Sequence, residues 1–348
     1  MAGNSKYKLK ILSLIDVLTE KTDREHMLTT SEMCEELEKR GIKAERKSIY
    51  NDIETLREYG FEIVHVRAPK NGFYLGKRRL EISEAHLLTD AVQAADFLPE
   101  DKKSTLIKKV LSSLSEYETE KILSKISVKY SKSGAADAMG VLNAIHSAID
   151  SGKQLNIKYA RRCIVEKSLS AQVKEFTVTP YALTWAGEHY YLIANNGKYD
   201  NLMHLRVDRI QRAKVAEEEA RPFSEVSEYR EFFDVADYTE KVFNMFSGEI
   251  AEIQLVCDNS IIEDISDRFG SDGEYRPYDI GTFVVKAQAG ISEGLVSWLF
   301  QFGAKIRIKA PQTLKDMYAK RLEEINRAMR RQLSVSYTHL RAHETSQD

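Results

Sequence analysis

The 348-residue chain lacks the features of membrane, exported and disulfide-bonded proteins. No apolar run approaches the roughly 18–20 residues that cross a bilayer, and the polar, basic N-terminus has no apolar signal region. The three cysteines, Cys34, Cys163 and Cys257, are far apart and form no metal-binding spacing. Scattered cysteines fit a reducing compartment. We therefore expect a cytoplasmic protein with no membrane partner and no metal site.

Motifs for catalysis are missing as well. The sequence has no nucleophile elbow, no metal triad and no carboxylate pair in a matched motif, and the small polar run at 131–137 lacks the Gly-Lys-Ser/Thr of a phosphate-binding loop. We expect no enzymatic activity and no cofactor. An enzyme with a regulatory DNA-binding head is the alternative, which turnover or a bound cofactor would reveal.

The small net charge of −2 is unevenly distributed along the chain. Residues 1–80 contain 16 Lys and Arg against 13 Asp and Glu, a balance of +3, so the remainder contains 35 against 40, a balance of −5. The length predicts two or three domains. A basic end on an acidic body favours a protein that contacts DNA with one end.

Residues 28–75 have the pattern of two short helices followed by a hairpin. Thr29 and Glu32 form the capping pattern of a helix that Gly41 ends. A second helix begins near Arg46 and ends at Gly60, and its apolar positions recur at helical spacing. Residues 61–67 then alternate, 69–72 form a turn and 73–75 return. The order predicts a winged helix-turn-helix over residues 1–80. The apolar stripe of the second helix is Ile49, Ile53 and Leu56.

The second helix and the hairpin carry the side chains expected to contact DNA. In a helix-turn-helix the N-terminal part of the second helix meets base edges, where Arg and Lys read guanine and Asn pairs with adenine. Between Val64 and Arg79 there are five cations and no acid, which suits phosphate contacts. An ordinary solvated helix face is the alternative. The candidates are Arg46, Lys47, Ser48, Tyr50 and Asn51 on the helix and Arg67 and Lys70 on the hairpin.

The segment 45–60 resembles the winged helix of bacterial transcriptional regulators that carry a WYL domain. It departs from that pattern at Glu45, where the family often has Ser or Thr, and at Asn51, where the family often has a basic residue. These departures bear on the operator sequence rather than on the binding mode. The resemblance implies double-stranded operator DNA as a partner.

Residues 81–137 predict a helical connector, with helices over 83–97, 102–114 and 117–126 and a linker at 131–137. Its apolar stripes favour a homodimer, since helix-turn-helix proteins commonly bind paired half-sites. Packing within one chain is the alternative. An N-terminal helix at 7–18 is expected to pack through Ile11, Leu12, Ile15 and Leu18.

Residues 138–216 change to short strands after one helix at 141–150. The strands are expected at 155–159, 173–179, 181–185, 190–194 and 203–207, which suggests a small, strongly bent sheet or barrel. Tyr190-Tyr191-Leu192, Pro180-Tyr181 before it and the run 204–210 after it resemble the WYL family, with Tyr190 in place of Trp. The resemblance implies an effector pocket on an Sm-like small β-barrel, with a nucleotide or single-stranded nucleic acid as effector.

Five residues are candidates for that effector site. His204 and Arg206 share one face of a strand, and the guanidinium forks of Arg206 and Arg209 match phosphate or carboxylate oxygens. His204 could assist, and Tyr159 or Tyr191 could stack on a base. One alternative is a structural Arg206–Asp208 or Arg209–Asp208 pair with a satisfied histidine. Another is an RNA-binding module, since Tyr191, Arg206 and Arg209 would serve that role equally.

The C-terminal third divides into three segments. Residues 217–247 form an acidic and then aromatic linker, expected to pack on both of its neighbours. Residues 248–333 have strand and helix patterns, end in a helix over 314–329 and resemble the C-terminal extension of WYL regulators, which implies an α+β sandwich. The last segment, 334–348, resembles translated sequencing-adapter read-through and is expected to be non-native. Its His339 and His343, at i, i+4, lack a third metal ligand.

The whole sequence therefore predicts a multidomain α+β protein: a DNA-binding transcriptional regulator whose effector domain modulates operator binding. The proposed route is linkage, in which an effector that binds two dimer arrangements differently shifts the spacing of the recognition helices.

Overall fold

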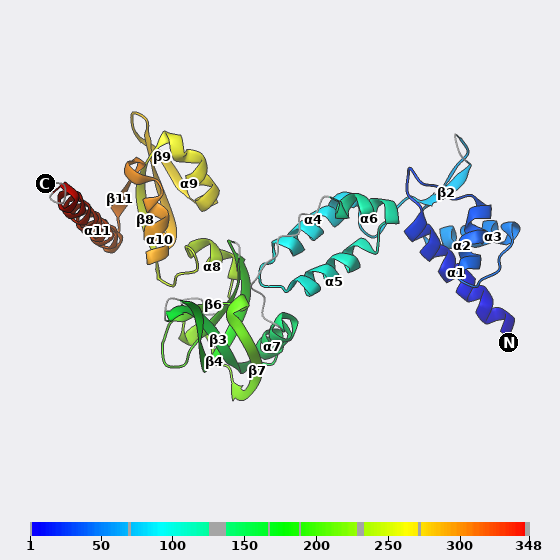
Figure 1. Ribbon diagram of the computed structural model, residues 1–348, viewed down its shortest axis with the longest axis horizontal. Coiled ribbons are helices and arrows are strands. Elements are labelled where there is room, and N and C mark those ends of the chain that lie inside the picture. The colour runs from blue at the N-terminus through cyan, green and yellow to red at the C-terminus, as the bar shows by residue number, and fades with distance from the viewer. Residues whose placement is uncertain are drawn as a thin grey trace. The chain divides into compact units, whose positions relative to one another are not determined.

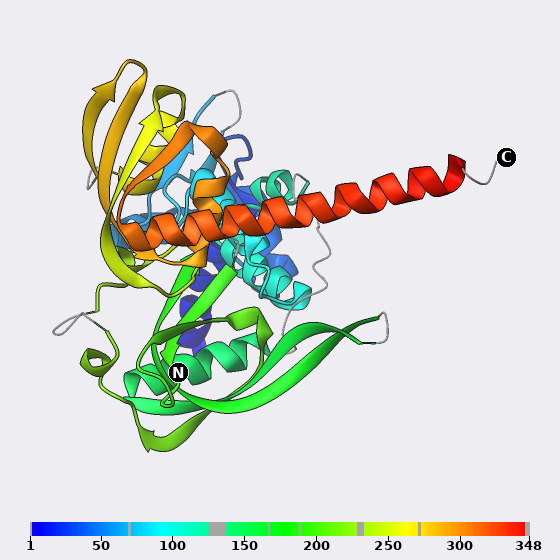
Figure 2. The ribbon, with the colours of Figure 1, turned by 90° about the vertical axis from the view of Figure 1, so that its left-hand side faces the viewer.

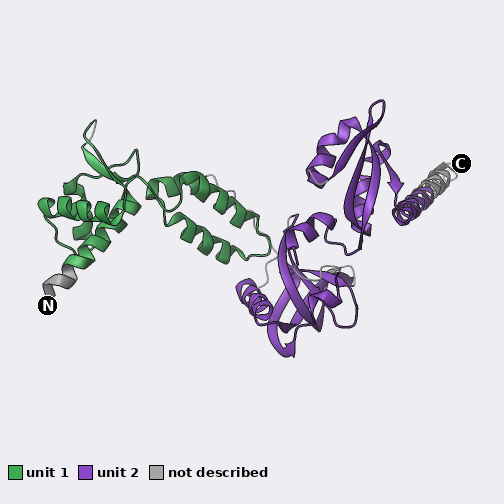
Figure 3. Ribbon diagram, turned by 180° about the vertical axis from the view of Figure 1, so that it is seen from behind, with its two compact units in different colours: residues 1–134 green, residues 135–348 purple. Residues whose placement is uncertain are grey.

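The computed structural model describes residues 2–68, 71–124, 137–165, 168–187, 189–227, 233–270 and 273–344. It is a mixed α+β structure with two compact units, residues 1–134 and 135–348 (Figures 1 and 3). Over the described residues, no helix has a segment both long and apolar enough to cross a membrane.

The first part of unit 1, called the head below (residues 2–80), contains three helices and a hairpin. They are α1 (Ala2–Lys21), α2 (Thr30–Lys39), α3 (Arg46–Tyr59), β1 (Ile63–Val66) and β2 (Gly72–Leu75). Thr29 caps α2 reciprocally with Glu32, as predicted. Gly60 ends α3 with φ +113°, a conformation that side chains other than glycine rarely adopt.

The three helices and the hairpin enclose one apolar core. The predicted stripe on α1 was wrong in part, because Leu12 is 61% exposed while Leu14 and Val17 are fully buried. The buried face of α1 is rotated from the predicted one, so that Lys10, Leu14, Val17 and Leu18 point inward. The remaining core side chains are Met33, Leu37, Ile49, Ile53, Leu56, Ile63, Phe73 and Leu75.

The second part of unit 1, the helical connector (residues 81–124), consists of α4 (Ile82–Ala94), α5 (Glu100–Leu111) and α6 (Glu116–Leu123). Ala85, Ile107, Leu111, Leu114 and Ile122 form its core. On α4, Thr89 is fully buried, whereas Leu88 beside it is 41% exposed. Most of the predicted linker, 131–136, lies outside the described residues, and Asp137 caps the next helix.

Unit 2 begins with α7 (Ala138–Asp150) and a five-stranded antiparallel sheet in the order β6-β5-β4-β3-β7. Its long twisted hairpin, β3 with β4, is visible in green in Figure 2. Among the described residues no hydrogen-bonded pairing joins β6 to β7, so the predicted barrel is an open sheet rather than a closed one. The strands are β3 (Lys153–Val165), β4 (Ser168–Ala186), β5 (His189–Asn195), β6 (Leu202–Arg206) and β7 (Ile210–Glu219).

Two strand predictions needed correction. The segments 173–179 and 181–185 belong to the single strand β4, because a register irregularity at Pro180 absorbs the proline without ending the pairing. Strand β7 was missed, since its exposed face is charged and its last three residues, 217–219, were assigned to an acidic linker.

The segment after β7 packs on both neighbouring domains, as predicted. Helix α8 (Val235–Lys241) places Tyr238 against Ile193 of the first sheet. Phe243, just beyond it, joins the core of the last domain. Residues 228–232 lie outside the described part of the chain.

The last domain pairs a four-stranded antiparallel sheet, ordered β11-β8-β10-β9, with helices. Helix α11 continues to Glu344, well past the predicted end at Met329, because residues 330–344 contain neither proline nor glycine to stop it. The elements are β8 (Glu249–Asp258), α9 (Ile262–Phe269), β9 (Glu274–Asp279), β10 (Thr282–Ile291), α10 (Glu293–Phe300), β11 (Ile306–Ala310) and α11 (Gln312–Glu344).

Candidate nucleic-acid and effector sites

The N-terminal half of α3 presents a polar surface. Arg46, Lys47, Tyr50 and Asn51 are exposed, while Ile49 beside them is fully buried. Ser48, the other predicted contact on this helix, is turned toward α1, where its hydroxyl accepts a hydrogen bond from the Lys10 amine. The structure therefore brings four of the five predicted helix residues to the surface.

The hairpin beside α3 extends that surface. Arg67 is exposed, whereas Lys70 lies outside the described residues. The ring of His65 stacks on Phe73 with 4.4 Å between centroids, and its Nε2 lies 2.7 Å from the Asn71 side-chain oxygen. Tyr50 meets the edge of the same Phe73 ring at 5.8 Å. Phe73 is only 3% exposed, so its ring lies beneath Tyr50 of α3 and His65 of the hairpin and contacts both.

A buried ion pair lies directly behind this surface. Lys10 Nζ of α1 is 2.7 Å from Asp52 Oδ2 of α3, and the two side chains are only 8% and 0% exposed. Lys10 also contacts Ser48, so it links α1 to two positions of α3 that are four residues apart. Sequence reasoning missed the pair, although Asp52 stands three residues after Ile49 and four before Leu56, on the buried stripe.

In unit 2, three predicted effector residues share one face of the first sheet. Tyr191 is directly opposite Arg206, and Ile193 is opposite His204. Burial raises the pKa of Tyr191, and the nearby Arg206 and Arg209 guanidinium groups act in the opposite direction. Tyr159 is only 5% exposed, so its ring is part of the core and is not available for stacking on a ligand.

Arg206 and Arg209 differ in whether they already form an ion pair within the protein. Arg206 makes two parallel hydrogen bonds to Asp208, Nε to Oδ1 at 2.9 Å and Nη2 to Oδ2 at 2.7 Å. This bidentate pair raises the pKa of Arg206. Arg209 has no ion pair among the described residues. Arg209 is therefore the cation of this cluster that is available to an anionic ligand.

His204 is held in a neutral form by its surroundings. Its Nε2 lies 3.0 Å from the Tyr238 hydroxyl and its Nδ1 lies 3.3 Å from the Ser247 hydroxyl. Burial lowers its pKa to about 4. Tyr238 and Ser247 also line a cavity of about 340 Å³ together with Leu202 and Ile250. His204 can order that cavity's wall but brings no positive charge to an anion near pH 7.

A second groove, of about 430 Å³, lies on strands β3, β4 and β7. Lys158 stands between its strand partners Glu175 and Arg212, and Lys214 follows on the same face of β7. Lys158 contacts Glu175 at 3.5 Å, while Arg212 and Lys214 are exposed and have no ion pair among the described residues. The sequence did not reveal this groove, because β7 was not recognised as a strand.

Comparison with known proteins identifies both domains of unit 2. The WYL domain model matches residues 140–215, and the WCX domain model matches residues 249–325. This chain contains a WYL domain and a WCX domain. The matched ranges lie inside the predicted domains 138–216 and 248–333. The five-stranded sheet is thus the WYL domain, and the four-stranded sheet is the WCX domain.

Over the whole chain, the similarity to a solved structure is low. The solved structure of the proteasome accessory factor B/C (PafBC) of Arthrobacter aurescens is 16% identical, with a TM-score of 0.29. The match covers 89% of this chain and 47% of PafBC, so this chain spans about half the length of that protein. No curated protein matches.

The WYL domain contains both candidate sites: the sheet face with Tyr191, His204 and Arg206, called the Tyr191 face below, and the groove with Lys158, Arg212 and Lys214, called the cationic groove below. The cavity beside His204 is lined by the WYL domain, the segment after it and the first residues of the WCX domain, Glu249 and Ile250. Among the described residues no group of three side chains could bind a metal ion.

Proposed function

We propose that this protein is a DNA-binding transcriptional regulator whose WYL domain binds an effector. The observation that carries the proposal is the surface of α3, where Arg46, Lys47, Tyr50 and Asn51 are exposed beside a hairpin while the opposite face is buried. This arrangement supports a winged helix-turn-helix over residues 1–80. The WYL and WCX domains support a regulator of the WYL type.

In the proposed complex, the N-terminal half of α3 enters the major groove. Asn51 pairs bidentately with adenine, and Arg46 and Lys47 read guanine or contact phosphate. Arg67, with Lys70 beyond it, contacts the backbone from the hairpin. Ser48 acts through Lys10 and holds the helix in place rather than contacting bases.

The proposed effector site is the Tyr191 face of the WYL domain, whose strand order and single preceding helix support an Sm-like fold. Arg209 binds a phosphate or carboxylate, and Arg206, already paired with Asp208, fixes the rim of the site. The effector is a nucleotide or a single-stranded nucleic acid. The protein works in the cytoplasm as a homodimer and catalyses no reaction, and effector binding changes the spacing of its two α3 helices.

Replacing Asn51 by Ala should lower operator affinity by about 1–3 kcal/mol and relax selectivity at one base position, because a bidentate contact is lost.

Replacing Arg67 by Ala should weaken binding to all duplexes, because only a phosphate contact is lost. It should also reduce the salt slope, the dependence of the logarithm of affinity on the logarithm of salt concentration, by about 1. Selection from random duplex DNA, followed by titrations at several salt concentrations, measures both effects.

The matched control is Lys39→Ala on α2, which removes an exposed lysine that is already paired with Glu36. It should leave affinity and salt slope unchanged. Failure to enrich any duplex, with or without nucleotides and short oligonucleotides, would contradict the proposed function.

The cationic groove supports a second candidate function, binding of single-stranded nucleic acid by the WYL domain. Lys158 of β3 and Arg212 and Lys214 of β7 lie on one face of two adjacent strands, an arrangement suited to successive phosphates. The double variant Arg212→Ala/Lys214→Ala should lower the salt slope for single-stranded RNA by about 1.4, at about 0.7 per phosphate contact.

The control for the groove is Lys174→Ala, since Lys174 is exposed on the other face of β4. Filter binding of RNA and DNA oligonucleotides to the full chain provides the measurement. Equal salt slopes for the groove variant and the Lys174 variant would exclude the groove as the binding surface.

A further inference from the structure

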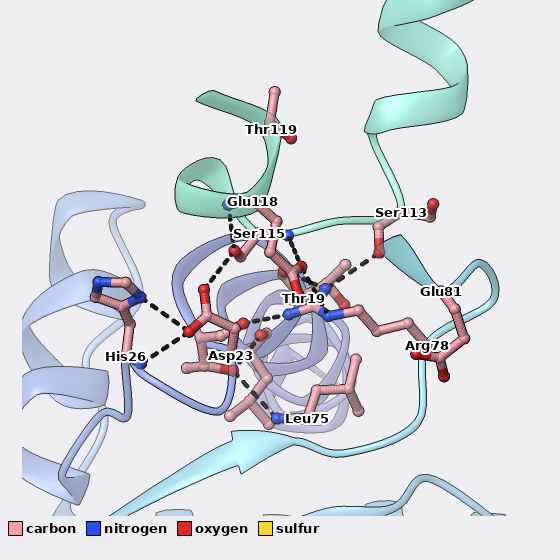
Figure 4. Close-up of polar contacts among 12 residues, drawn as sticks. Thr19, Asp23, His26, Leu75, Arg78, Glu81, Ser113, Ser115, Glu118 and Thr119 are labelled. Carbon is pink, nitrogen blue, oxygen red and sulfur yellow. Dashed lines mark hydrogen bonds and ion pairs between the residues drawn. The ribbon is translucent and has the colours of Figure 1, made fainter. Parts of the chain in front are cut away.

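The connection between the head and the helical connector is centred on one buried arginine, Arg78, which follows β2. Its guanidinium donates to the Thr19 carbonyl oxygen at 2.9 Å and also to the Thr22 carbonyl oxygen, both at the C-terminal end of α1. It also donates to the Ser113 carbonyl oxygen at 3.1 Å, in the turn before α6 (Figure 4). A cation is favourable at a helix C-terminus, where carbonyl groups lack partners.

The same guanidinium is paired with a carboxylate of the connector. Arg78 Nε lies 3.3 Å from Glu118 Oε2, and the arginine side chain is only 6% exposed. Burial lowers the pKa of Arg78, while Glu118, Asp23 and Glu81 act in the opposite direction. One side chain therefore contacts α1, the α5–α6 turn and α6 at once.

Asp23 supplies a second buried link between the two parts. Its carboxylate accepts a hydrogen bond from the Ser115 hydroxyl at 2.7 Å, and Ser115 is the residue that caps α6. The backbone amide and the ring of His26 also donate to it (Figure 4), as does the backbone amide of Glu25. Burial favours the neutral acid, but these hydrogen bonds outweigh it and lower the pKa of Asp23.

Two further contacts lie beside these buried charges, one within the head and one between the head and the connector. The Thr22 hydroxyl accepts from the Leu75 amide at 3.1 Å, which ties the end of β2 to α1. The His26 ring stacks on Tyr117 of α6 with 3.6 Å between centroids. Separating the head from the connector would therefore strip partners from two buried charges together, which is strongly unfavourable.

We propose that Arg78 is a positioning residue that makes the head and the helical connector one rigid body. A movement of the connector then turns α3 directly, with no flexible hinge between them. The rigidity of the junction is a property of the free protein and does not depend on the proposed function. Only its consequence, that the effector response reaches DNA through this junction, rests on the proposed function.

Spin labels on the full chain test the rigidity without DNA. Glu38 on α2 and Ser104 on α5 are exposed and carry the labels as cysteines, after Cys34 and Cys163 are replaced by Ser and Cys257 by Ala. Pulsed electron resonance should give one narrow distance distribution for the parent protein. Arg78→Ala should broaden it, while Arg79→Ala, which removes an exposed neighbouring cation, should leave it narrow.

Two milder variants keep the test decisive if Arg78→Ala does not fold. Arg78→Lys keeps the charge but cannot make the same four contacts, and Ser115→Ala removes the bond to Asp23. Both should broaden the distribution less than Arg78→Ala. A broad distribution in the parent protein, or unchanged widths in every folded junction variant, would overturn the proposal.

A second experiment tests this consequence by measuring the operator affinity of the protein with and without effector. Allosteric coupling typically changes affinity by about 5- to 150-fold, and Arg78→Lys should reduce that factor toward one while leaving affinity without effector unchanged. If no operator exists, the proposed function fails while the distance measurement still decides the junction. A retained effector response in a variant with a broadened distribution would contradict the consequence alone.

Discussion

Asp52→Ala is expected to destabilise the head by about 3–5 kcal/mol, because it leaves the Lys10 ammonium buried without its carboxylate. The pair joins α1 to α3 at 2.7 Å with almost no exposure to water. Apart from the Lys10 ammonium, the Asp52 oxygens have no partner among the described residues, so Lys10 alone neutralises this carboxylate. The loss is a large fraction of the stability of a domain of this size.

Chemical unfolding followed by circular dichroism and by tryptophan fluorescence separates this effect from the rest of the chain. Both tryptophans, Trp185 and Trp298, lie in unit 2. The fluorescence transition should therefore stay in place while the dichroism transition of unit 1 shifts to lower denaturant.

The double variant Lys10→Met/Asp52→Leu is the matched control, since replacing both charges by apolar side chains of similar size is often neutral or stabilising. It should recover most of the loss. Equal destabilisation in Asp52→Ala and in the double variant would mean that lost packing, not the unpaired lysine, is responsible.

The second large effect is a dependence of WYL-domain stability on pH through His204. Its pKa is about 4 in the folded protein and 6.5 ordinarily, so between these values the unfolded chain binds a proton that the folded chain does not. Stability should be highest above pH 6.5 and fall by about 3 kcal/mol as the pH is lowered to 4, at 1.36 kcal/mol per pKa unit.

Tryptophan fluorescence during urea unfolding between pH 4 and 7.5 measures this dependence, since Trp185 lies in the WYL sheet. Carboxylates also titrate in this range, so the decisive quantity is the difference between the parent protein and His204→Gln. That difference should shrink steadily below pH 6.5. His146→Gln, on an exposed position of α7, should follow the parent protein. Parallel curves for the parent and His204→Gln would rule out the buried neutral histidine.

Local signals in the sequence predicted the elements of the head well. The Thr29–Glu32 capping pattern and Gly60 act within a few residues, so they locate helix ends without tertiary information. The Lys10–Asp52 pair was beyond that reasoning, because periodicity assigns charged residues to the surface. Only the packing of α1 on α3 gives each charge its partner.

The WYL domain shows a different limit. Alternation placed His204 and Arg206 on one face, as the strand pairing has them. Which of the two arginines is already neutralised depends on the turn after β6, where Asp208 meets Arg206 and not Arg209. The groove depends on β7 lying beside β3, a pairing between residues about sixty apart in sequence that no local pattern encodes.

The junction around Arg78 has a consequence for the time course of protein synthesis. Its bonds join residues far apart in the chain: Ser113 is 35 positions after Arg78, and Ser115 is 92 positions after Asp23. At about 5–20 residues per second, Asp23 leaves the ribosome on the order of 5–20 s before the serine that binds it. In the later part of that interval the nascent chain carries Asp23 and Arg78, two charges destined for burial, before their partners in the connector, Ser113, Ser115 and Glu118, have been made.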